Sequence, residues 1–487
     1  MSLDGIKRVR KKRIAENYEK IVENYEKNDS NFWHGENRKN RNINLVPKKL
    51  SSKKSKINIL PYLLNKRVFV TFIISFLIVA LTLTSAYSYL FVKDNYDFVK
   101  LFKDGKYLVL FQNNTELRAT GGFIGSFATI EIKNGKLINY NFNTNIYKLD
   151  NEFVKNNSIK PADSVLADFV PDKKLAMRDS NWSVDFPTAA EQVAWFYEKE
   201  GGTPVDGVIA INATVMVDYL KLTGPVDLPD YNTSLTSENF LSTVQYKIEK
   251  EYYLDPENKI ANEPKSILKA MMEKLLARLT GEKKYLEAIN LVKKELQEKQ
   301  ILFYFYDDNK EKISMENNWA GDVKQVNGDY LYINNSNLGS NKSSLNVSEK
   351  FELNSSSLNN TITNTLTITR THSGSYDWPD GENKNYMRIL VPYGAKIISA
   401  SLDNVDCLKY VETKKEAGKT EFALWVNIVP RSSRILSLSY TLPDNISKTN
   451  HTLYLQKQSG NLGDEAKVII DGIVKFDGKL MFDQAIK

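Results

Sequence analysis

Residues 205–224 read VDGVIAINATVMVDYLKLTG and contain two patterns in direct succession. The first part, VDGVIAIN, is a short apolar run that is typical of a buried β-strand. The second part, ATVMVDYLKLTG, has the pattern of a helix, which we expect to end at Gly224 because glycine tolerates the backbone of a helix end and Pro225 follows. A strand that leads directly into a helix is the building unit of layered α/β domains.

Upstream segments have strand patterns. KYLVLFQ (106–112) predicts a short apolar strand. SFATIEIKNGKLINYNF (126–142) alternates on both sides of Asn134 and Gly135, and this dipeptide favours a tight hairpin turn. The sequence therefore predicts a strand followed by a hairpin.

A helix is expected between these strands and the 205–212 strand. PTAAEQVAWFYEKE (187–200) has Thr188 and Glu191 at the spacing of a capping box, just after a proline. Strands and helices thus alternate along the chain. We assign residues 93–327 to an α/β domain with α-β-α layers.

The pattern changes from residue 328 onward. Short alternating segments recur between turn residues, among them NTLTITRTH, FALWVNIVP and ILSLSYTLP. Such spacing is typical of antiparallel β-sandwiches. We assign residues 328–487 to a linker and an antiparallel β-sandwich of the immunoglobulin-like kind.

Residues 68–92 form an apolar segment of 25 residues without a charge. About 20 apolar residues suffice for a transmembrane helix. Lysine and arginine precede this segment, so the positive-inside rule predicts a single-pass protein of the cell membrane with residues 1–67 in the cytoplasm and the remainder outside. The alternative is a signal peptide with a cleavage site at Thr84 and Ala86, but the preceding region is too long for that.

The charge distribution is uneven. Residues 1–67 hold 18 Lys/Arg against 7 Asp/Glu, whereas the remainder holds 48 against 52. The first part is therefore expected to be a basic, largely disordered arm and linker that acts as a positive-inside topology signal beside the lipid bilayer. The alternative is a surface helix held near anionic lipid by its lysines and arginines. The remainder has a net charge of −4, and we expect no binding of nucleic acid by it.

Cysteine and histidine are rare. Cys407 is the one cysteine, so an intrachain disulfide is impossible, and the histidines are His34, His372 and His451. This set does not provide a Cys/His metal cluster by spacing. It also disfavours a Ser-His-Asp or Cys-His nucleophile.

A candidate anion-binding loop follows the first strand. NNTELRATGGFIGS (113–126) contains Arg118, whose guanidinium can hold a phosphate or carboxylate through paired N–H donors. Gly121 and Gly122 would allow the backbone to approach a ligand closely. The substrate-binding candidates of this loop are Asn113, Asn114, Glu116, Gly121 and Gly122. The alternative is a plain turn with Arg118 in a structural ion pair.

A second candidate loop precedes the 187–200 helix. AMRDSNWSVDF places Arg178, Asp179 and Asp185 around Trp182. Here an arginine could bind a diphosphate while Asp179 and Asp185 bind Mg²⁺, which needs few protein carboxylates when phosphate supplies further ligands. Trp182 is a further substrate-binding candidate. The alternative is an Arg-Asp bridge that anchors the loop.

Four blocks in this order resemble the bacterial domain-of-unknown-function family 4012 over residues 95–345. They begin with LVLFQNNTELRATGG, MRDSNWSVDFPTAAEQ, VDGVIAINATVMVDY and GDYLYINNSNLGS. No activity follows from this resemblance alone.

The chain is more distantly similar to the LytR-CpsA-Psr envelope transferases. That similarity implies one N-terminal anchor helix and an enzyme that transfers glycopolymers from polyprenyl diphosphate to the cell wall. It also implies that arginines bind the diphosphate and aspartates bind Mg²⁺. The chain departs from that family at Asn113 and Asn114, where an aspartate is expected, and in lacking a later Arg-x-Arg block. Lys265 is a basic residue of the helical part that we expect on a solvated face.

These observations lead to two functional hypotheses. In the first, a membrane-anchored envelope protein binds or transfers a phosphate-bearing, polyprenyl-linked glycan precursor, and the catalytic residues of a glycopolymer phosphotransferase are Arg118, Arg178 and Asp179. Mg²⁺ would lie at Asp179, with Asp185 or Glu116 helping, and the sandwich would bind cell-wall polymer. In the second, the protein is a non-catalytic envelope binding or scaffold protein.

Overall fold

The computed structural model describes residues 96–487, apart from residues 162, 257, 259–262, 282–284, 359–360 and 448–450. The expected cytoplasmic arm (1–67) and the expected membrane helix (68–92) lie outside the described residues. Within the described part, no helix is both long and apolar enough to cross a membrane.

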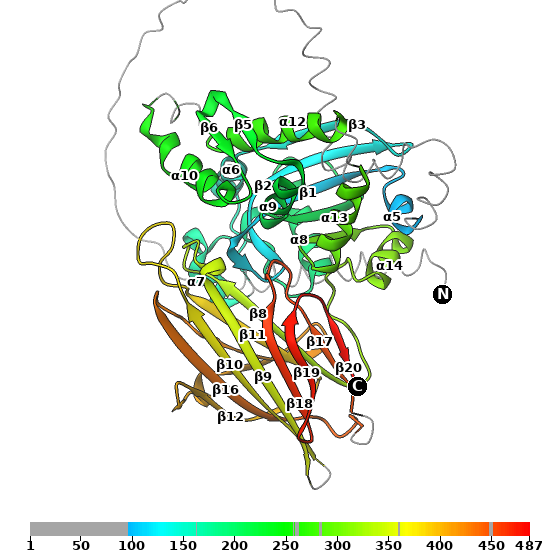
Figure 1. Ribbon diagram of the computed structural model, residues 1–487, viewed down its shortest axis with the longest axis vertical. Helices are drawn as coiled ribbons and strands as arrows, with labels where there is room; N and C mark the ends of the chain where they lie inside the picture. Colours follow the sequence, from blue (N-terminus) through cyan, green and yellow to red (C-terminus); the bar gives the residue numbers. More distant parts are fainter. Residues whose placement is uncertain are drawn as a thin grey trace, which may run out of the picture.

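A mixed sheet forms the centre of the first half of the described chain, with the strand order β3-β2-β1-β4-β7. β1 pairs in parallel with β4, while β1–β2, β2–β3 and β4–β7 are antiparallel. The strands predicted around 106–112 and 205–212 are therefore neighbours at the centre of one sheet (Figure 1). The bounds are β1 (Gly105–Arg118), β2 (Gly121–Lys133), β3 (Lys136–Asn143), β4 (Gly207–Asn212) and β7 (Ile301–Phe305).

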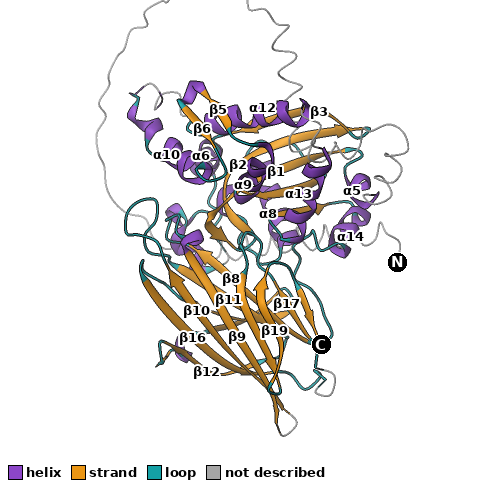
Figure 2. Ribbon diagram, in the orientation of Figure 1, coloured by secondary structure: helices purple, strands orange, loops and turns teal. Residues whose placement is uncertain are grey.

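Helices cover both faces of this sheet (Figure 2). Tyr107 and Val109 of β1 belong to the hydrophobic core on one face, and Leu108 and Leu110 belong to the core on the other. This alternation follows from the two-residue period of a strand and explains why residues 107–111 of β1 are all apolar. The first face is covered by α5 (Tyr96–Leu101), α9 (Thr214–Thr223), α10 (Phe240–Glu249), α12 (Ser266–Gly281), α13 (Tyr285–Gln297) and α14 (Asp308–Glu316). The second face is covered by α6 (Ile146–Asn156), α7 (Ser164–Phe169) and α8 (Phe186–Lys199).

Local turn and cap residues explain where these elements end. Asn134 and Gly135 have φ values of 52° and 65°, as a tight hairpin turn requires, so the predicted hairpin is confirmed. Helix α9 ends at Gly224 with φ 80°, also as predicted, and leads to the small hairpin of β5 (Val226–Leu228) and β6 (Thr233–Leu235).

Helix α8 begins at Phe186, one residue before the predicted Pro187, and its N-cap lies three residues before the predicted Thr188. The N-cap is Asp185, whose side chain accepts a hydrogen bond from Thr188 N at 3.2 Å, so Thr188 is inside the helix. Aspartate is among the preferred N-cap residues, and proline fits the first turn of a helix. The capping-box pattern at Thr188 and Glu191 was therefore misleading.

Two sheets pack face to face in the second half of the chain and enclose their own hydrophobic core (Figure 1). The first sheet comprises β13 (Val405–Asp406), β12 (Lys396–Leu402), β16 (Ser432–Thr441), β10 (Thr361–His372), β9 (Val347–Leu358), β18 (Asp464–Ile470) and β19 (Ile473–Leu480). The second sheet comprises β14 (Glu412–Glu416), β15 (Lys419–Trp425), β11 (Asn385–Val391), β8 (Asp329–Asn337), β17 (Leu453–Gln456) and β20 (Gln484–Ile486). A sandwich-like β region is thus present.

This sandwich is not purely antiparallel, which corrects the expectation. β17 pairs in parallel with β8, and β18 pairs in parallel with β9. The last strands of the chain lie beside the first strands of the sandwich. Long connections of this kind permit parallel pairing, which a two-residue hairpin does not. Alternation of apolar and polar residues indicates which face of a strand is buried. It does not indicate which strand pairs with it or in which direction, so the parallel pairs could not be predicted.

The two halves are joined by buried polar contacts. Lys299 Nζ, between α13 and β7, lies 2.7 Å from Asp483 Oδ1 just before β20, and the two side chains are 1% and 4% exposed. Tyr454 OH donates to the same carboxylate at 2.8 Å, and Asn318 Nδ2 donates to it at 3.0 Å. A buried ammonium needs such a partner because desolvation otherwise disfavours its charge.

We predict that Asp483→Asn destabilises the protein strongly. The variant leaves the Lys299 ammonium buried without its counter-ion, which costs about 3–5 kcal/mol in comparable cases. Chemical denaturation of the wild type and the variant measures this. Asp168→Asn is the matched control, since Asp168 forms an ion pair with Lys173 in which both side chains are about two-thirds exposed (67% and 66%), and we expect a change within about 1 kcal/mol. Equal stability of Asp483→Asn and the wild type would contradict this account of the junction.

Candidate functional site

A cavity of about 850 Å³ lies between the central sheet and the helices of its first face. Its interior is apolar, and its lining comes from the carboxyl ends of β1 and β4 and from α9, α10 and α12. The apolar lining includes Phe111, Ile211, Phe240, Val244, Leu268 and Met271. The carboxyl ends of neighbouring parallel strands are where α/β sheets commonly bind ligands.

The spacing of residues on α10 explains the apolar wall. Phe240, Val244 and Ile248 follow one another at intervals of four residues and all line the cavity. Residues at this spacing lie on one face of a helix. The same pattern is found wherever a helix packs on a core, so the cavity was not predictable from it.

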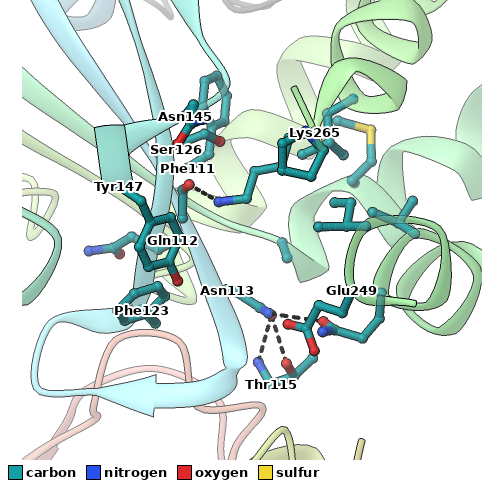
Figure 3. Close-up of a pocket in the computed structure, with 18 of the residues that line it drawn as sticks. Phe111, Gln112, Asn113, Thr115, Phe123, Ser126, Asn145, Tyr147, Glu249 and Lys265 are labelled. Atoms are coloured by element: carbon teal, nitrogen blue, oxygen red, sulfur yellow. Dashed lines mark hydrogen bonds between the residues drawn. The ribbon is translucent and has the colours of Figure 1, made fainter. Parts of the chain in front are cut away.

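Polar and charged side chains gather at one part of the cavity lining, which we call its mouth, and Figure 3 labels several of them. They come from β1, α6, α10, the residue before α12 and the segment after β8. They include Asn113, Tyr147, Glu249, Lys265 and Lys342.

We expected Lys265 on a solvated face, but its side chain lines the cavity. Its Nζ donates to Gly125 O and lies 5.5 Å from the centre of the Tyr147 ring. Burial of the ammonium, helped by the charge of Lys342, lowers the pKa of Lys265 to about 8. An ammonium in such a place gains free energy when an anion approaches it.

Lys342 is the second cation of the mouth, and it belongs to a network with Glu116 and Arg118. Glu116 Oε2 accepts from Lys342 Nζ, and Glu116 Oε1 lies 2.7 Å from Arg118 Nη2. Lys342 Nζ also lies 4.0 Å from Glu249 Oε1. Burial acts to raise the pKa of Glu116, but the charges of Arg118 and Lys342 outweigh it and leave that pKa below its ordinary value. Glu116 is therefore a carboxylate at neutral pH.

Arg178 lies between two carboxyl groups. Its Nη1 is 3.0 Å from Asp150 Oδ2, its Nε is 3.2 Å from Asp179 Oδ2, and its guanidinium lies 5.1 Å from the Tyr147 ring centre. Burial raises the pKa of Asp179, while the charges of Arg178 and Arg118 oppose this rise.

Arg118, at the end of β1, and Arg178 thus both act on the carboxyl group of Asp179. The stretches that carry them are in contact, since Asn181 Nδ2 donates to Gly122 O at 3.0 Å. Arg118 lies 5.4 Å from the ring centre of Phe123, and the Phe123 and Tyr147 rings are 6.3 Å apart. Of the residues that the structure describes, however, the cavity lining includes neither Arg118 nor Arg178. Both arginines are buried and bonded to carboxyl groups of this chain.

The expectation that residues 113–126 form a loop is wrong, because β1 continues to Arg118 and β2 begins at Gly121, so that the backbone there is paired in the sheet. The other candidates of this stretch have structural contacts. Asn113 lines the cavity, while Asn114 Nδ2 donates to Gly460 O at 2.9 Å in the sandwich. A Cβ on Gly121 would lie 2.3 Å from Gln112 Oε1, and one on Gly122 would lie 2.1 Å from the backbone of Asn113. The close approach that these glycines permit is therefore to the protein itself.

Trp182 and Asp185 of the second loop also contact the protein. Trp182 stacks on Tyr386 at 6.0 Å, and Arg388 lies 4.3 Å from its ring centre. Asp185 caps α8 through one oxygen and accepts from Val323 N at 2.9 Å through the other. Both residues thus join the first half of the chain to the sandwich side.

The expectation of a Mg²⁺ site is not tested. Asp179 is bonded to Arg178, and Asp185 has the separate partners given above. Among the described residues, no three His, Cys, Asp or Glu side chains are grouped so as to hold a metal ion.

Asp150 and Glu200 form an acid pair behind Arg178. Burial and the charge of Asp150 raise the pKa of Glu200 to about 9, and burial raises that of Asp150 to about 6. Asp150 Oδ1 and Glu200 Oε2 are buried and have no donor among the described residues. A proton shared between these oxygens would satisfy both, so we infer that the pair carries one negative charge at neutral pH.

Residues 103–248 match the sequence model of a family described as "Protein of unknown function (DUF4012)". This segment contains β1 to β4, most of α10 and both Arg118 and Arg178, and it confirms the resemblance to family 4012. The similarity to the LytR-CpsA-Psr transferases stays a prediction. A search of curated proteins finds no significant match.

Solved structures give only remote likenesses. A proposed nutrient-binding protein from Legionella pneumophila is 9% identical, with a TM-score of 0.20 over 25% of this chain and 50% of that protein. An M1 zinc metallopeptidase from Deinococcus radiodurans is 14% identical, with a TM-score of 0.17 over 26% and 32%. Leukotriene A4 hydrolase from Saccharomyces cerevisiae is 12% identical, with a TM-score of 0.17 over 26% and 23%. The matches span half or less of these relatives' length, and scores this low carry no argument.

We predict that Glu200→Gln flattens the dependence of stability on pH. The pKa of Glu200 is higher in the folded protein than its ordinary value of 4.5. The protonated form therefore stabilises the fold fully below that value, and this stabilisation is lost as the pH rises towards about 9. Glutamine keeps a donor for Asp150 but does not titrate.

Melting temperatures measured from about pH 5 to about pH 9 test this, since the wild type should lose more stability over that range than the variant. Glu198→Gln, an exposed position on the same helix, should follow the wild type. Parallel curves for Glu200→Gln and the wild type would show that the pair shares no proton.

Proposed function

We propose that the protein binds a phosphate-bearing, polyprenyl-linked glycan precursor at the cell envelope. The observation that carries this proposal is the apolar cavity of about 850 Å³ with Lys265 and Lys342 at its mouth. The polyprenyl chain would occupy the cavity, and the phosphate would lie at the lysines. Residues 68–92 would anchor the protein in the membrane and place it beside its ligand.

The apolar interior supports a hydrocarbon tail. Burial of apolar surface contributes about 25 cal/mol per Å², so a long chain binds well in a cavity lined by Phe240, Val244 and Leu268. A small polar ligand would leave this surface without contacts.

The mouth supports an anionic head group. Lys265 and Lys342 both line the cavity. Lys265 Nζ bonds to a backbone carbonyl, that of Gly125, and lies over the Tyr147 ring, so it is the cation on which a phosphate would mainly rely, whereas Lys342 Nζ is already paired with Glu116. A phosphate would offset the desolvation of Lys265, because an opposite charge favours the protonated form. Asn113 adds an amide for hydrogen bonding.

The ion pairs of Arg118 and Arg178 with carboxyl groups favour binding without catalysis. In a transferase, Arg118 and Arg178 would bind the diphosphate and Asp179 would bind Mg²⁺. Both arginines would first have to leave Glu116 and Asp150, which are buried with them. Removing one partner of a buried ion pair is strongly unfavourable.

Transfer to a cell-wall polymer is the second candidate, and it rests on the Arg178–Asp179 contact beside Arg118. It agrees with the fold that the transferase similarity implies, in which helices cover both faces of a sheet. The sandwich, which we expected to be immunoglobulin-like, would then bind the wall polymer. Release of polyprenyl phosphate on addition of Mg²⁺ and acceptor polymer, lost in Arg178→Ala, would establish transfer.

The binding proposal predicts different effects of changes to the tail site and to the head site. The ligands are a polyprenyl monophosphate and the uncharged polyprenol of equal length, titrated against the full chain in detergent. Val244→Trp fills the cavity and should weaken the binding of both lipids. Lys265→Met should weaken the binding of polyprenyl monophosphate about tenfold, since a hydrogen bond to a charged group contributes about 1.5–3 kcal/mol. The affinity for polyprenol should stay unchanged.

Raising the pH from about 7 to about 9 should also weaken phosphate binding to the wild type, because Lys265 loses its proton near its pKa of about 8. Lys265→Met should lack this part of the pH dependence. The controls are Val474→Trp on β19 and Lys269→Met on α12, both at exposed positions. If Val244→Trp leaves the affinities for polyprenyl monophosphate and for polyprenol unchanged, the cavity is not the lipid site.

A further inference from the structure

A loop of the sandwich lies at the cavity mouth. Residues 373–382, SGSYDWPDGE, connect β10 to β11 and approach α10, where the loop is drawn in yellow in Figure 1. Trp378 Nε1 donates to Glu249 Oε2 at 3.3 Å, and Lys250 Nζ lies 4.7 Å from the Trp378 ring centre. Lys342 N donates to Pro379 O at 2.8 Å. The loop therefore contacts two residues that line the mouth, Glu249 and Lys342.

The loop is held in place by hydrogen bonds within it and to neighbouring residues. Asp380 Oδ2 accepts from Ser375 N at 2.8 Å and from Asn346 Nδ2 at 2.9 Å. His372 Nδ1 accepts from Gly374 N at 3.1 Å. Aromatic side chains on a loop fixed in this way lose little conformational entropy when they bind a ligand.

Two aromatic side chains of this loop face solvent. Trp378 is 41% exposed and Tyr376 is 67% exposed. Two carboxylates accompany these rings. Asp377 lies between Tyr376 and Trp378 in the sequence, and Glu249 accepts the hydrogen bond from the Trp378 indole. Exposed rings next to hydrogen-bond acceptors form an amphipathic surface, with an apolar face and polar edges.

We propose that this loop binds the saccharide of the lipid-linked precursor, with a sugar ring on Trp378 and Tyr376. The C–H face of a pyranose is apolar and packs on an aromatic ring, while its hydroxyl groups donate to carboxylates. The proposal rests on the proposed function, because a lipid in the cavity with its phosphate at Lys342 directs the attached sugar out through the mouth. The contact of Lys342 with Pro379 then places the loop beside that sugar.

Two other roles for the aromatic residues give different results in experiments. Insertion into the bilayer is disfavoured because the loop carries Asp377, Asp380 and Glu382, which anionic lipid repels. A purely structural brace would explain the contact of Trp378 with Glu249 and Lys250, but it gives no reason for Tyr376 to be the more exposed of the two rings.

The experiment compares two ligands on the full chain in detergent. One is a polyprenyl diphosphate, and the other is the same lipid carrying an N-acetylhexosamine disaccharide. Trp378→Ala and Tyr376→Ala should each weaken the sugar-bearing lipid by about threefold to tenfold and leave the sugar-free lipid unchanged. Tyr410→Ala is the control, since Tyr410 is 66% exposed in another part of the sandwich, and it should change neither affinity.

The outcomes separate the two proposals. Equal weakening of both lipids by Trp378→Ala would show a brace, and loss of binding to anionic vesicles in the variants would show membrane insertion. Each result overturns the saccharide site, as does unchanged affinity for the sugar-bearing lipid. Failure of the sugar-free lipid to bind the wild type would overturn the lipid proposal instead. In that case, quenching of tryptophan fluorescence by the free disaccharide, absent in Trp378→Ala, still tests the loop.

Discussion

The burial of charged side chains around the end of β1 is the constraint on which the rest of the molecule depends. Glu116, Arg118, Arg178, Asp150 and Asp179 are all largely removed from water, and charges in such places require partners. Their pairing occupies both arginines with carboxyl groups of the same chain. It also fixes the first half of the chain to the sandwich, because Arg118 donates to Asn337 O and Lys342 bonds to Glu116. The cations left to face the cavity are lysines.

Much of the fold could be predicted because it depends on local patterns. The apolar run of β4, the Asn134-Gly135 turn and the glycine after α9 all fix structure through neighbouring residues. The parallel pairs β8–β17 and β9–β18 could not be predicted, because they join strands more than 100 residues apart. The start of α8 was missed because two adjacent cap patterns competed, and Asp185 is the cap that forms.

The candidate site shows the same division. The sequence suggested one hypothetical site for Arg118 and Arg178, and in the structure the stretches that carry them are in contact, since Asn181 Nδ2 donates to Gly122 O at 3.0 Å. The sequence did not reveal that Glu116 and Asp150 neutralise the two arginines, because whether an arginine faces a ligand or a carboxylate depends on burial. Lys342 is 226 residues from Glu116 in the chain, and Lys265 precedes an ordinary amphipathic helix, so neither carried a local signal. The cavity lies between β1 and the helices α10 and α12. The spacing of apolar residues along a helix does not show whether the helix packs tightly on the sheet or leaves a cavity beneath it.

Photo-cross-linking tests the central claim, that this cavity holds the lipid chain, most directly. A polyprenyl monophosphate with a diazirine in its chain would be bound to the full-length protein in detergent, irradiated, and mapped by mass spectrometry. The account predicts adducts on the cavity residues of α10 and α12, such as Phe240, Val244, Leu268 and Met271, that excess polyprenyl phosphate competes away. Competed adducts found only on residues 68–92 or on the sandwich, with none in the cavity, would contradict it.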